Sequence, residues 1–302
     1  MNAPADPSTH TRIRLDVAYD GTDFNGWSTQ PGLRTVQGVL EEALRVLFTR
    51  HAPPPRLSVA GRTDAGVHAL GQVAHVDLTR RQIDTLINPR RPRNVGDDAD
   101  AGVALARRLN GILGPATDVV ISGASVAPPG FDARFSALWR RYEYRLAPGG
   151  AVRDPIQRRR TTWHSAPLDV EAMDAAAAGL VGLHDFAAYC KPREGATTIR
   201  TLQVFRWSKD DDGVLTADLR ADAFCHSMVR ALVGACVAVG DGRLAVDDVV
   251  ALRNDAVRSN AFNVMAARGL TLMEVGYPDD AELAVRAELT RQRRVLSVVV
   301  PD

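Results

Sequence analysis

The feature that most constrains this chain is a six-element order of strand and helix patterns that occurs twice along its 302 residues. In the first half, residues 13–19 alternate apolar and polar side chains, as a half-buried strand does. Residues 36–47 then place apolar side chains at helical spacing after Thr35, a favourable N-cap residue. The rest of this half predicts two short strands, a helix and a strand, at 57–60, 72–78, 100–113 and 118–122.

The second half repeats this β-α-β-β-α-β order without repeating the residues themselves. It predicts a strand, a helix, a hairpin of two strands, an apolar helix and a closing strand, at 140–147, 169–181, 199–208, 214–220, 226–239 and 270–277. This order is typical of a ferredoxin-like unit, so we expect an α+β fold made of two ferredoxin-like halves with antiparallel sheets.

The domain boundaries are expected to follow this repeat. We expect an N-terminal domain over residues 12–114 and a C-terminal domain over residues 115–278. Residues 88–102 are rich in proline, glycine and charge, which predicts a mobile insertion. Residues 1–11 have no apolar run, so they predict a disordered tail and not a secretion signal, and residues 279–302 predict a C-terminal tail.

Composition excludes several classes of protein. A hydrophobic fraction of 45% and a charged fraction of 24% are typical of a soluble globular protein, and no apolar run reaches the ~20 residues of a membrane helix. The three cysteines Cys190, Cys225 and Cys236 are odd in number and lack CxxC spacing. We therefore expect buried thiols in a reducing cytoplasm, and neither a disulfide framework nor a zinc site.

The net charge of +1 conceals a local concentration of arginine. Residues 131–160 contain eight arginines against three carboxylates, a local net charge of +5. Such a patch suits a polyanionic partner. A general preference for arginine is the alternative, since Lys191 and Lys209 are the only lysines, but this preference does not explain the clustering.

The stretch "SVAGRTDAGVHALGQVAHVDL", residues 58–78, leaves two interpretations of Asp64. In the first, Asp64 shapes a turn in which Gly66 adopts positive φ and Arg62 is a solvated charge. In the second, Asp64 is a reacting group on a fold that often binds RNA through stacked aromatic rings. The spacing of its glycines resembles a phosphate loop, but Val67 and His68 stand where that motif needs Lys and Ser or Thr.

Other catalytic motifs are absent from the sequence. There is no G-x-S-x-G for an acyl-transfer serine and no H-E-x-x-H for zinc. His68 and His75 are seven residues apart, across a loop and a strand, and we interpret them as structural groups that form hydrogen bonds rather than as metal ligands.

Several stretches together resemble the TruA family of tRNA pseudouridine synthases. They are "YDGTDFNGW", "VQGVLEEAL", "AGRTDAGVHALGQVAH", "FDARFSALWRRYEYRL", "GLHDF" and "ADAFCHSMVRALVGA", which keep their order over roughly residues 12–278. The chain departs from the family pattern at Ser28, at residues 225–227 and in the long 88–102 segment. The resemblance implies two ferredoxin-like halves whose antiparallel sheets face a central RNA-binding cleft.

The resemblance also implies an activity and its residues. It implies isomerisation of uridine to pseudouridine in the anticodon stem-loop, at positions 38–40 of the tRNA, by a cytoplasmic homodimer that needs no cofactor and no metal. Asp64 would act as nucleophile or base. Arg230 would be its counter-ion, Tyr142 would stack on the target uracil, and Arg62 would fill the gap left by the extruded nucleotide.

The charge pattern adds candidate phosphate contacts, and two other activities remain open. The candidate contacts are Arg140, Arg141, Arg158, Arg159 and Arg160. A non-catalytic RNA-binding protein of the same fold is one alternative, although an intact Asp64 and Arg62 argue against it. A carboxylate glycosidase is the other, and the lack of a second carboxylate in the motif argues against that.

Overall fold

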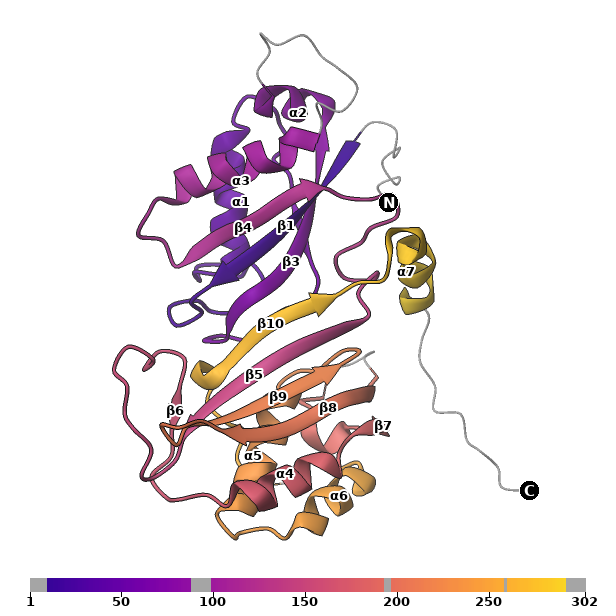
Figure 1. Cartoon of the computed structure of the whole chain (residues 1–302). Helices are drawn as coiled ribbons and strands as arrows, with labels where there is room; N and C mark the ends of the chain where they lie inside the picture. The colour runs from indigo at the N-terminus through magenta and orange to yellow at the C-terminus, as the bar shows by residue number, and fades with distance from the viewer. Residues whose placement is uncertain (1–9, 88–98, 193–196, 258–259, 292–302) are drawn as a thin grey trace, which may run out of the picture. The chain divides into compact units, whose positions relative to one another are not determined.

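The computed structural model of the chain describes residues 10–87, 99–192, 197–257 and 260–291, and these form two compact units (Figure 1). Among the described residues, unit 1 comprises those from His10 up to Ala137 together with Tyr277–Leu289. Unit 2 comprises the described residues from Leu138 to Gly276 together with Thr290 and Arg291. Both units are mixed α+β, with strands that pair almost entirely antiparallel, as the sequence predicts at this coarse level. No helix among the described residues is long and apolar enough to span a bilayer.

In unit 1, the central strand β1 pairs with β3 on one side and with β4 on the other, and β2 pairs with β3. The elements are β1 His10–Tyr19, α1 Val36–Leu47, β2 Leu57–Val59, β3 His68–Thr79, α2 Arg80–Leu86, α3 Ala99–Leu113 and β4 Val119–Val126. The alternation of β1 buries Ile13, Leu15 and Val17 completely, or nearly so. Its other side chains are only partly buried, as expected of a strand with one covered face.

The predicted first helix is confirmed together with its cap, because the Oγ1 of Thr35 accepts a hydrogen bond from the Gly38 N–H at 3.2 Å. The sequence does not predict α2. A signal for it exists, since Thr79 and Gln82 form a capping box in which each side chain bonds the other residue's backbone N–H.

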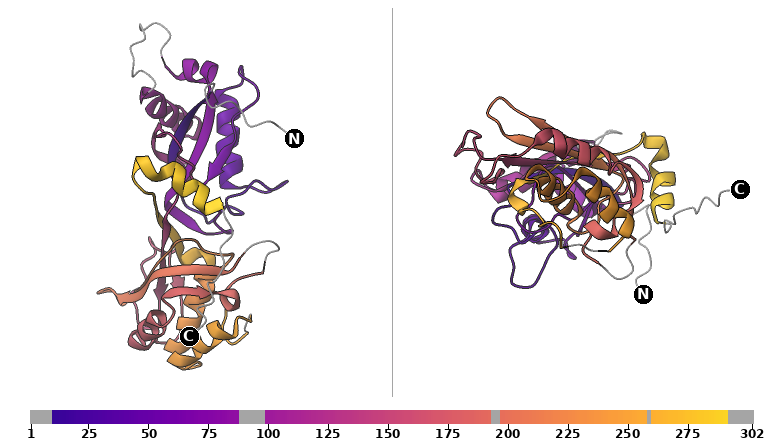
Figure 2. Two further views of the ribbon diagram at one scale, coloured as in Figure 1. Left: turned by 90° about the vertical axis from the view of Figure 1, so that its right-hand side faces the viewer. Right: turned by 90° about the horizontal axis from the view of Figure 1, so that it is seen from below.

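In unit 2, five strands follow the order β10-β5-β9-β8-β7, and β6 pairs in parallel with β5. The strands are β5 Trp139–Ala147, β6 Thr162–Trp163, β7 Gly182–Asp185, β8 Ile199–Lys209, β9 Leu215–Ala221 and β10 Leu270–Gly276. The helices are α4 Val170–Ala178, α5 Met228–Gly240 and α6 Val246–Asp255, with one-turn helices η2 at Ala187–Tyr189 and η3 at Ala267–Gly269. Helices α4, α5 and α6 contact one another, and α4 packs on β8, so they form one layer beside the sheet (Figures 1 and 2).

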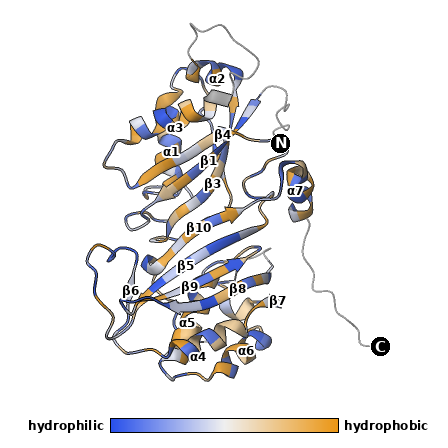
Figure 3. Cartoon of the chain, in the orientation of Figure 1, coloured by the Kyte–Doolittle hydropathy of each residue, from blue (hydrophilic) through white to orange (hydrophobic). Residues whose placement is uncertain are grey.

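Strand β5 divides its side chains between the two faces of this sheet. Tyr142, Tyr144 and Leu146 are buried, whereas the intervening Arg141 and Glu143 are only partly covered. Much of β5 is accordingly hydrophilic in Figure 3. We call the surface that carries Arg141 and Glu143 the polar face of unit 2.

The unit boundary lies after Ala137 and not at residue 114. The reason is β4, whose residues from Val119 onward pair antiparallel with β1 and so belong to the first unit. The expected C-terminal tail is also wrong in part, because the described residues include η4 Asp280–Glu282 and α7 Leu283–Arg291. Leu283 is buried in unit 1, and its carbonyl accepts a hydrogen bond from Ser136 at 3.1 Å.

Two other expected segments fall mainly outside the described residues. Of the predicted insertion 88–102, only its end is described, where it begins α3. Of the predicted tail 1–11, residues 10 and 11 already belong to β1.

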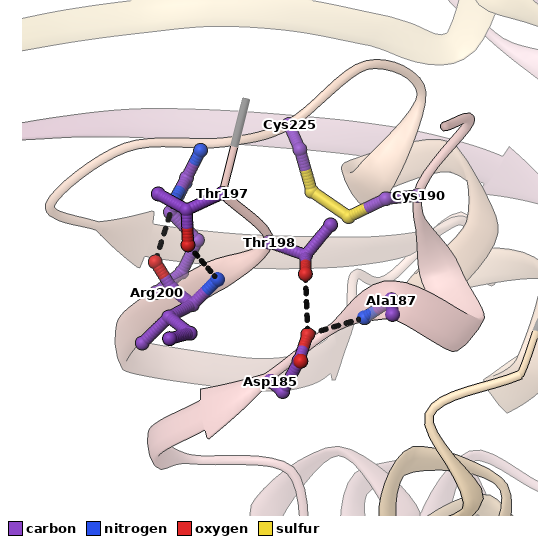
Figure 4. Close-up of a disulfide and its surroundings, with 8 residues drawn as sticks. Asp185, Ala187, Cys190, Thr197, Thr198, Arg200 and Cys225 are labelled. Carbon is purple, nitrogen blue, oxygen red and sulfur yellow. Dashed lines mark hydrogen bonds between the residues drawn. A yellow bond between two sulfur atoms is a disulfide. The ribbon is translucent and has the colours of Figure 1, made fainter. Parts of the chain in front are cut away.

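The expectation of three free thiols is wrong for two of them. Cys190 and Cys225 form a disulfide with their Cα atoms 5.8 Å apart (Figure 4). Their 35-residue separation gives no local signal, and the fold brings them together where the Lys191 N–H donates to the His226 carbonyl at 3.0 Å. Cys236 is a free buried thiol, as expected, and burial raises its pKa to about 12.

Candidate active site

The segment from Ala60 to Val67 joins β2 to β3 and carries both Arg62 and Asp64. Its backbone is tied to the loop that follows β1. The Trp27 N–H donates to the Thr63 carbonyl at 3.1 Å, and the Gly66 N–H donates to the Phe24 carbonyl at 3.2 Å. The position of Asp64 is therefore set by backbone bonds between segments about 40 residues apart in sequence.

Two glycines make this close approach possible. Gly66 has φ +77°, which confirms the positive φ expected of it. Gly26 has φ +85°, and a Cβ on it would lie 2.9 Å from the Thr63 carbonyl oxygen. The turn closes through a hydrogen bond from the Val67 N–H to the backbone carbonyl of Asp64 at 3.2 Å. This bond uses the main chain of Asp64, which is a half-buried residue.

A buried cluster of hydrogen bonds lies directly under the loop. The hydroxyls of Tyr19 and Thr63 are 2.8 Å apart, and the side-chain amide of Gln72 donates to Tyr19 at 3.3 Å and to the Gly61 carbonyl at 2.9 Å. Burial raises the pKa of Tyr19 to about 12, so it remains a neutral phenol at physiological pH. Sequence reasoning does not find this cluster, because its members are 44 and 53 residues apart.

Both histidines of this region are structural, as expected. The Nδ1 of His68 accepts a hydrogen bond from the Gly21 N–H at 3.0 Å, and the Nδ1 of His75 accepts one from the Ala133 N–H at 3.1 Å. Burial, followed by the charge of Arg12, lowers the pKa of His75 to about 4. Within the described part of the chain, no group of three or more His, Cys, Asp or Glu side chains could hold a metal ion.

Arg62 is exposed, and its guanidinium forms no hydrogen bond or ion pair with any described residue. This geometry is consistent with a solvated charge, and it is equally consistent with a side chain that becomes ordered only when it contacts a ligand.

Tyr142 lies in the middle of the unit 2 sheet, opposite Leu272 of β10 and Leu219 of β9. It is 8% exposed, and its ring meets that of Phe224 edge-on with centroids 5.2 Å apart. This burial favours a core aromatic, and a stacking role would require uracil to reach the ring beside Phe224.

Arg230 lies in the first turn of α5, and its guanidinium is held from two sides. It donates to the Met265 carbonyl at 3.2 Å and to the Ser227 hydroxyl at 3.1 Å. Ser227, the residue before α5, has φ +63°, a costly conformation for a residue other than glycine. Gly234 lets the segment from Asn263 approach α5, since a Cβ there would lie 1.9 Å from the Asn263 carbonyl oxygen. The tight packing thereby orients Arg230.

The five arginines predicted to contact phosphate do not form one group. Arg140 is 9% exposed, and its guanidinium donates to the Asp222 carbonyl at 2.7 Å, so it is a structural residue. Arg141 lies on the polar face, and Arg160 pairs with Glu143 at 3.1 Å. Arg158 and Arg159 are exposed in the segment before β6.

The four principal candidates belong to different units, Asp64 and Arg62 to unit 1, Tyr142 and Arg230 to unit 2. Unit 1 supplies a carboxylate on a loop of fixed backbone. Unit 2 supplies a guanidinium oriented by two acceptors, and an aromatic ring. A carboxylate can act as nucleophile or base, and a guanidinium can stabilise a negative charge.

Known proteins are similar to this chain over nearly its whole length. A family model described as tRNA pseudouridine synthase matches residues 176–278, which include Arg230. A protein of Leifsonia xyli named "tRNA pseudouridine synthase A" is 64% identical over 286 residues, covering 95% of this chain and 98% of the relative. Proteins of the same name from Streptomyces griseus and Mycobacterium leprae are 53% and 48% identical, and each alignment covers at least 97% of both chains.

These alignments span both units, the Asp64 loop and α5, so the likeness is not confined to one motif. The chain belongs to the tRNA pseudouridine synthase A family.

Proposed function

We propose that this protein is an isomerase that converts uridine to pseudouridine in tRNA. The observation that carries the proposal is the near full-length identity to relatives named for that activity. The reaction moves the attachment of the base from nitrogen to carbon, with no atom gained and no electron lost. It therefore requires no redox cofactor, nucleotide or metal, and its first requirement is a carboxylate that helps to break the glycosidic bond.

Asp64 is the carboxylate that we assign to this step, as covalent nucleophile or as base toward the sugar. Its main chain closes the turn through the bond from the Val67 N–H, so the loop backbone holds the residue in a defined position. Such a group has to stay ionised when RNA displaces water, and a positive partner favours the charged form. Arg230 is the proposed partner, because Met265 and Ser227 already orient its guanidinium.

Tyr142 and Arg62 are assigned to the nucleotide. Tyr142 would stack on the uracil, and the exposed Arg62 would fill the space that the base leaves in the RNA helix. Exposed Arg158 and Arg159 remain candidate phosphate contacts. We further propose the anticodon stem-loop as substrate, a cytoplasmic homodimer as the working form, and ferredoxin-like topology in each unit, which the strand and helix order supports.

The test is Asp64→Asn, which removes the charge and keeps the shape. Single-turnover pseudouridine formation should fall by many orders of magnitude, because an amide is neither a useful nucleophile nor a base. tRNA affinity and melting temperature should stay close to those of the parent. Asp84→Asn on α2 is the matched control, since it makes the same change of charge at a half-exposed carboxylate that lies 3.3 Å from Arg80.

Two outcomes would redirect the assignment. An Asp64→Asn protein that isomerises uridine at the parent rate would return Asp64 to a turn-forming role. A parent protein that binds tRNA tightly but forms no pseudouridine would favour a non-catalytic RNA-binding protein.

A further inference from the structure

We propose that Asp118 is a positioning residue for the reaction, because it fastens both ends of the loop that holds Asp64 in place. That loop is residues 20–34, between β1 and α1, and we call it the support loop. Asp118 directly precedes β4 and belongs to the same unit. This role rests on the proposed function, in which Asp64 is the reacting carboxylate, and it adds a residue that acts on Asp64 only through the support loop.

The two ends of the support loop meet at Asp118. Its backbone carbonyl accepts a hydrogen bond from the Asp20 N–H at 2.9 Å. Its carboxylate accepts two hydrogen bonds from the guanidinium of Arg34, each 2.7 Å long. Such a two-bond pair between a guanidinium and a carboxylate fixes direction as well as distance. One residue, 84 positions after Arg34 in the chain, therefore closes the support loop at its start and at its end.

The middle of the support loop is bonded to the chain on both sides of Asp64. The Trp27 N–H donates to the carbonyl of Thr63, the residue before Asp64, at 3.1 Å. The Gly66 N–H, two residues after Asp64, donates to the Phe24 carbonyl at 3.2 Å. Both bonds are at the long end of the usual range for N–H···O=C hydrogen bonds, so a small displacement of the support loop breaks them. The position of Asp64 therefore depends on where this loop is held.

Arg34 makes a second contact, which connects the ion pair to the middle of the support loop. Its guanidinium carbon lies 4.1 Å from the centre of the Phe24 ring, a cation–π distance, and Phe24 is buried. The Arg34 carbonyl also accepts a hydrogen bond from the Asn25 N–H at 2.8 Å. Asp118 thus orients the guanidinium that covers Phe24, and the carbonyl of Phe24 in turn bonds Gly66. Loss of the Asp118 carboxylate removes a restraint on this path.

The ion pair itself contributes little to folding, so an effect on the reaction can be separated from an effect on stability. The Arg34 side chain is 45% exposed and that of Asp118 is 24% exposed. Ion pairs that water reaches in this way add little to the free energy of unfolding. A shift of about 1 Å in a reacting group, by contrast, slows a reaction by as much as about 100-fold. We therefore expect a change in rate without a comparable change in melting temperature.

The test uses the single variants Asp118→Asn and Arg34→Gln and the double variant that combines them. Each single variant should slow single-turnover pseudouridine formation at saturating tRNA by about 10- to 100-fold, with tRNA affinity close to that of the parent. The double variant should be no slower than the slower single variant, because both changes remove the same contact. Asp118→Glu keeps the charge, and it should be faster than Asp118→Asn.

Asp77→Asn is the matched control. Asp77 also accepts two hydrogen bonds of 2.7 Å from an arginine, Arg12, and this pair joins β3 to β1 in the same unit. It lies near the start of β1, whereas the support loop follows the end of β1. The control makes the same change of charge at the same kind of ion pair, and it should keep the parent rate.

Amide hydrogen exchange gives a second measurement, on the free protein. Opening of the support loop exposes the N–H groups of Trp27 and Gly66 to solvent. Both amides should exchange faster in Asp118→Asn than in the parent, and Asp77→Asn should leave their exchange unchanged.

Unchanged rates in the single variants, losses that multiply in the double variant, or an equal loss in Asp77→Asn would overturn the proposal. Unchanged exchange of the Trp27 and Gly66 amides in Asp118→Asn would overturn it as well. Weaker tRNA binding by Arg34→Gln, with the parent rate kept in Asp118→Asn, would instead assign Arg34 to the RNA. Failure of the proposed isomerase is seen separately, in the parent rate, and exchange on the free protein still decides whether Asp118 holds the loop.

Discussion

The buried hydroxyl pair beneath the Asp64 loop gives a prediction whose size follows from the structure. The hydroxyls of Tyr19 and Thr63 are 2.8 Å apart and both residues are buried. Thr63→Val keeps the shape and leaves the Tyr19 O–H without its partner, which costs about 1–3 kcal/mol in the free energy of unfolding. Tyr19→Phe leaves the Thr63 hydroxyl unpaired at a similar cost, while Gln72 keeps its bond to the Gly61 carbonyl.

The double variant Tyr19→Phe/Thr63→Val removes donor and acceptor together. Its loss in the free energy of unfolding should therefore be smaller than the sum of the two single losses by about 1–2 kcal/mol. Thr63→Val should also slow pseudouridine formation by about 10- to 100-fold, because a shift of about 1 Å in a reacting group has an effect of that size. The assays are chemical denaturation and single-turnover kinetics at saturating tRNA.

Unit 2 offers a matched control for this comparison of single and double variants. The hydroxyls of Tyr144 and Thr162 are also buried and 2.8 Å apart. Thr162→Val should lower the free energy of unfolding and leave the rate of pseudouridine formation close to that of the parent. Additive effects of the Tyr19 and Thr63 variants, or full activity of Thr63→Val, would refute the idea that this pair holds Asp64 in place.

Three further predictions concern pH, redox state and assembly. The folded-state pKa of His75 is about 4, against an ordinary value near 6.5, so the unfolded chain binds the proton at a higher pH than the folded chain does. The free energy of unfolding should therefore fall by up to about 3 kcal/mol as the pH drops from 6.5 to 4. His75→Gln should remove this pH dependence from the free energy of unfolding measured by chemical denaturation. The Cys190–Cys225 disulfide closes a loop of about 35 residues, so its reduction should destabilise unit 2 by about 3–4 kcal/mol. Dithiothreitol should therefore lower the melting temperature of the parent protein, and it should have no such effect on Cys190→Ser. Light scattering should give twice the 32.6 kDa chain mass, and a monomer at working concentration would contradict the proposed homodimer.

Elements with a strong local pattern are predictable from this sequence. The strand at β1 alternates without exception between Ile13 and Val17, and α1 combines an apolar stripe with the Thr35 cap. The apolar α5 is equally clear. The unit boundary is not predictable in this way. Strand β4 joins unit 1 by pairing with β1 across about 100 residues, and no local pattern indicates that pairing.

The candidate site divides in the same way. The positive φ of Gly66 is predictable from a short stretch, because a turn is a local structure. The acceptors that orient Arg230 are not predictable from a short stretch. The Met265 carbonyl is 35 residues away, and the close approach of the Asn263 segment to α5 depends on Gly234. The disulfide escapes prediction for the same reason, because an odd number of cysteines with no motif spacing gives no pairing rule.

Arg140 and Arg141 show why a count of charges along the sequence mislocates a binding surface. They are neighbours in the sequence, yet the pleat sends Arg140 to the Asp222 carbonyl and Arg141 to the polar face. The residues that join Arg141 there, Arg206 and Arg220, come from two other strands and lie outside the arginine-rich stretch. A charge pattern in a strand therefore has to be sorted by face, with a period of two, before its net charge is assigned to a partner.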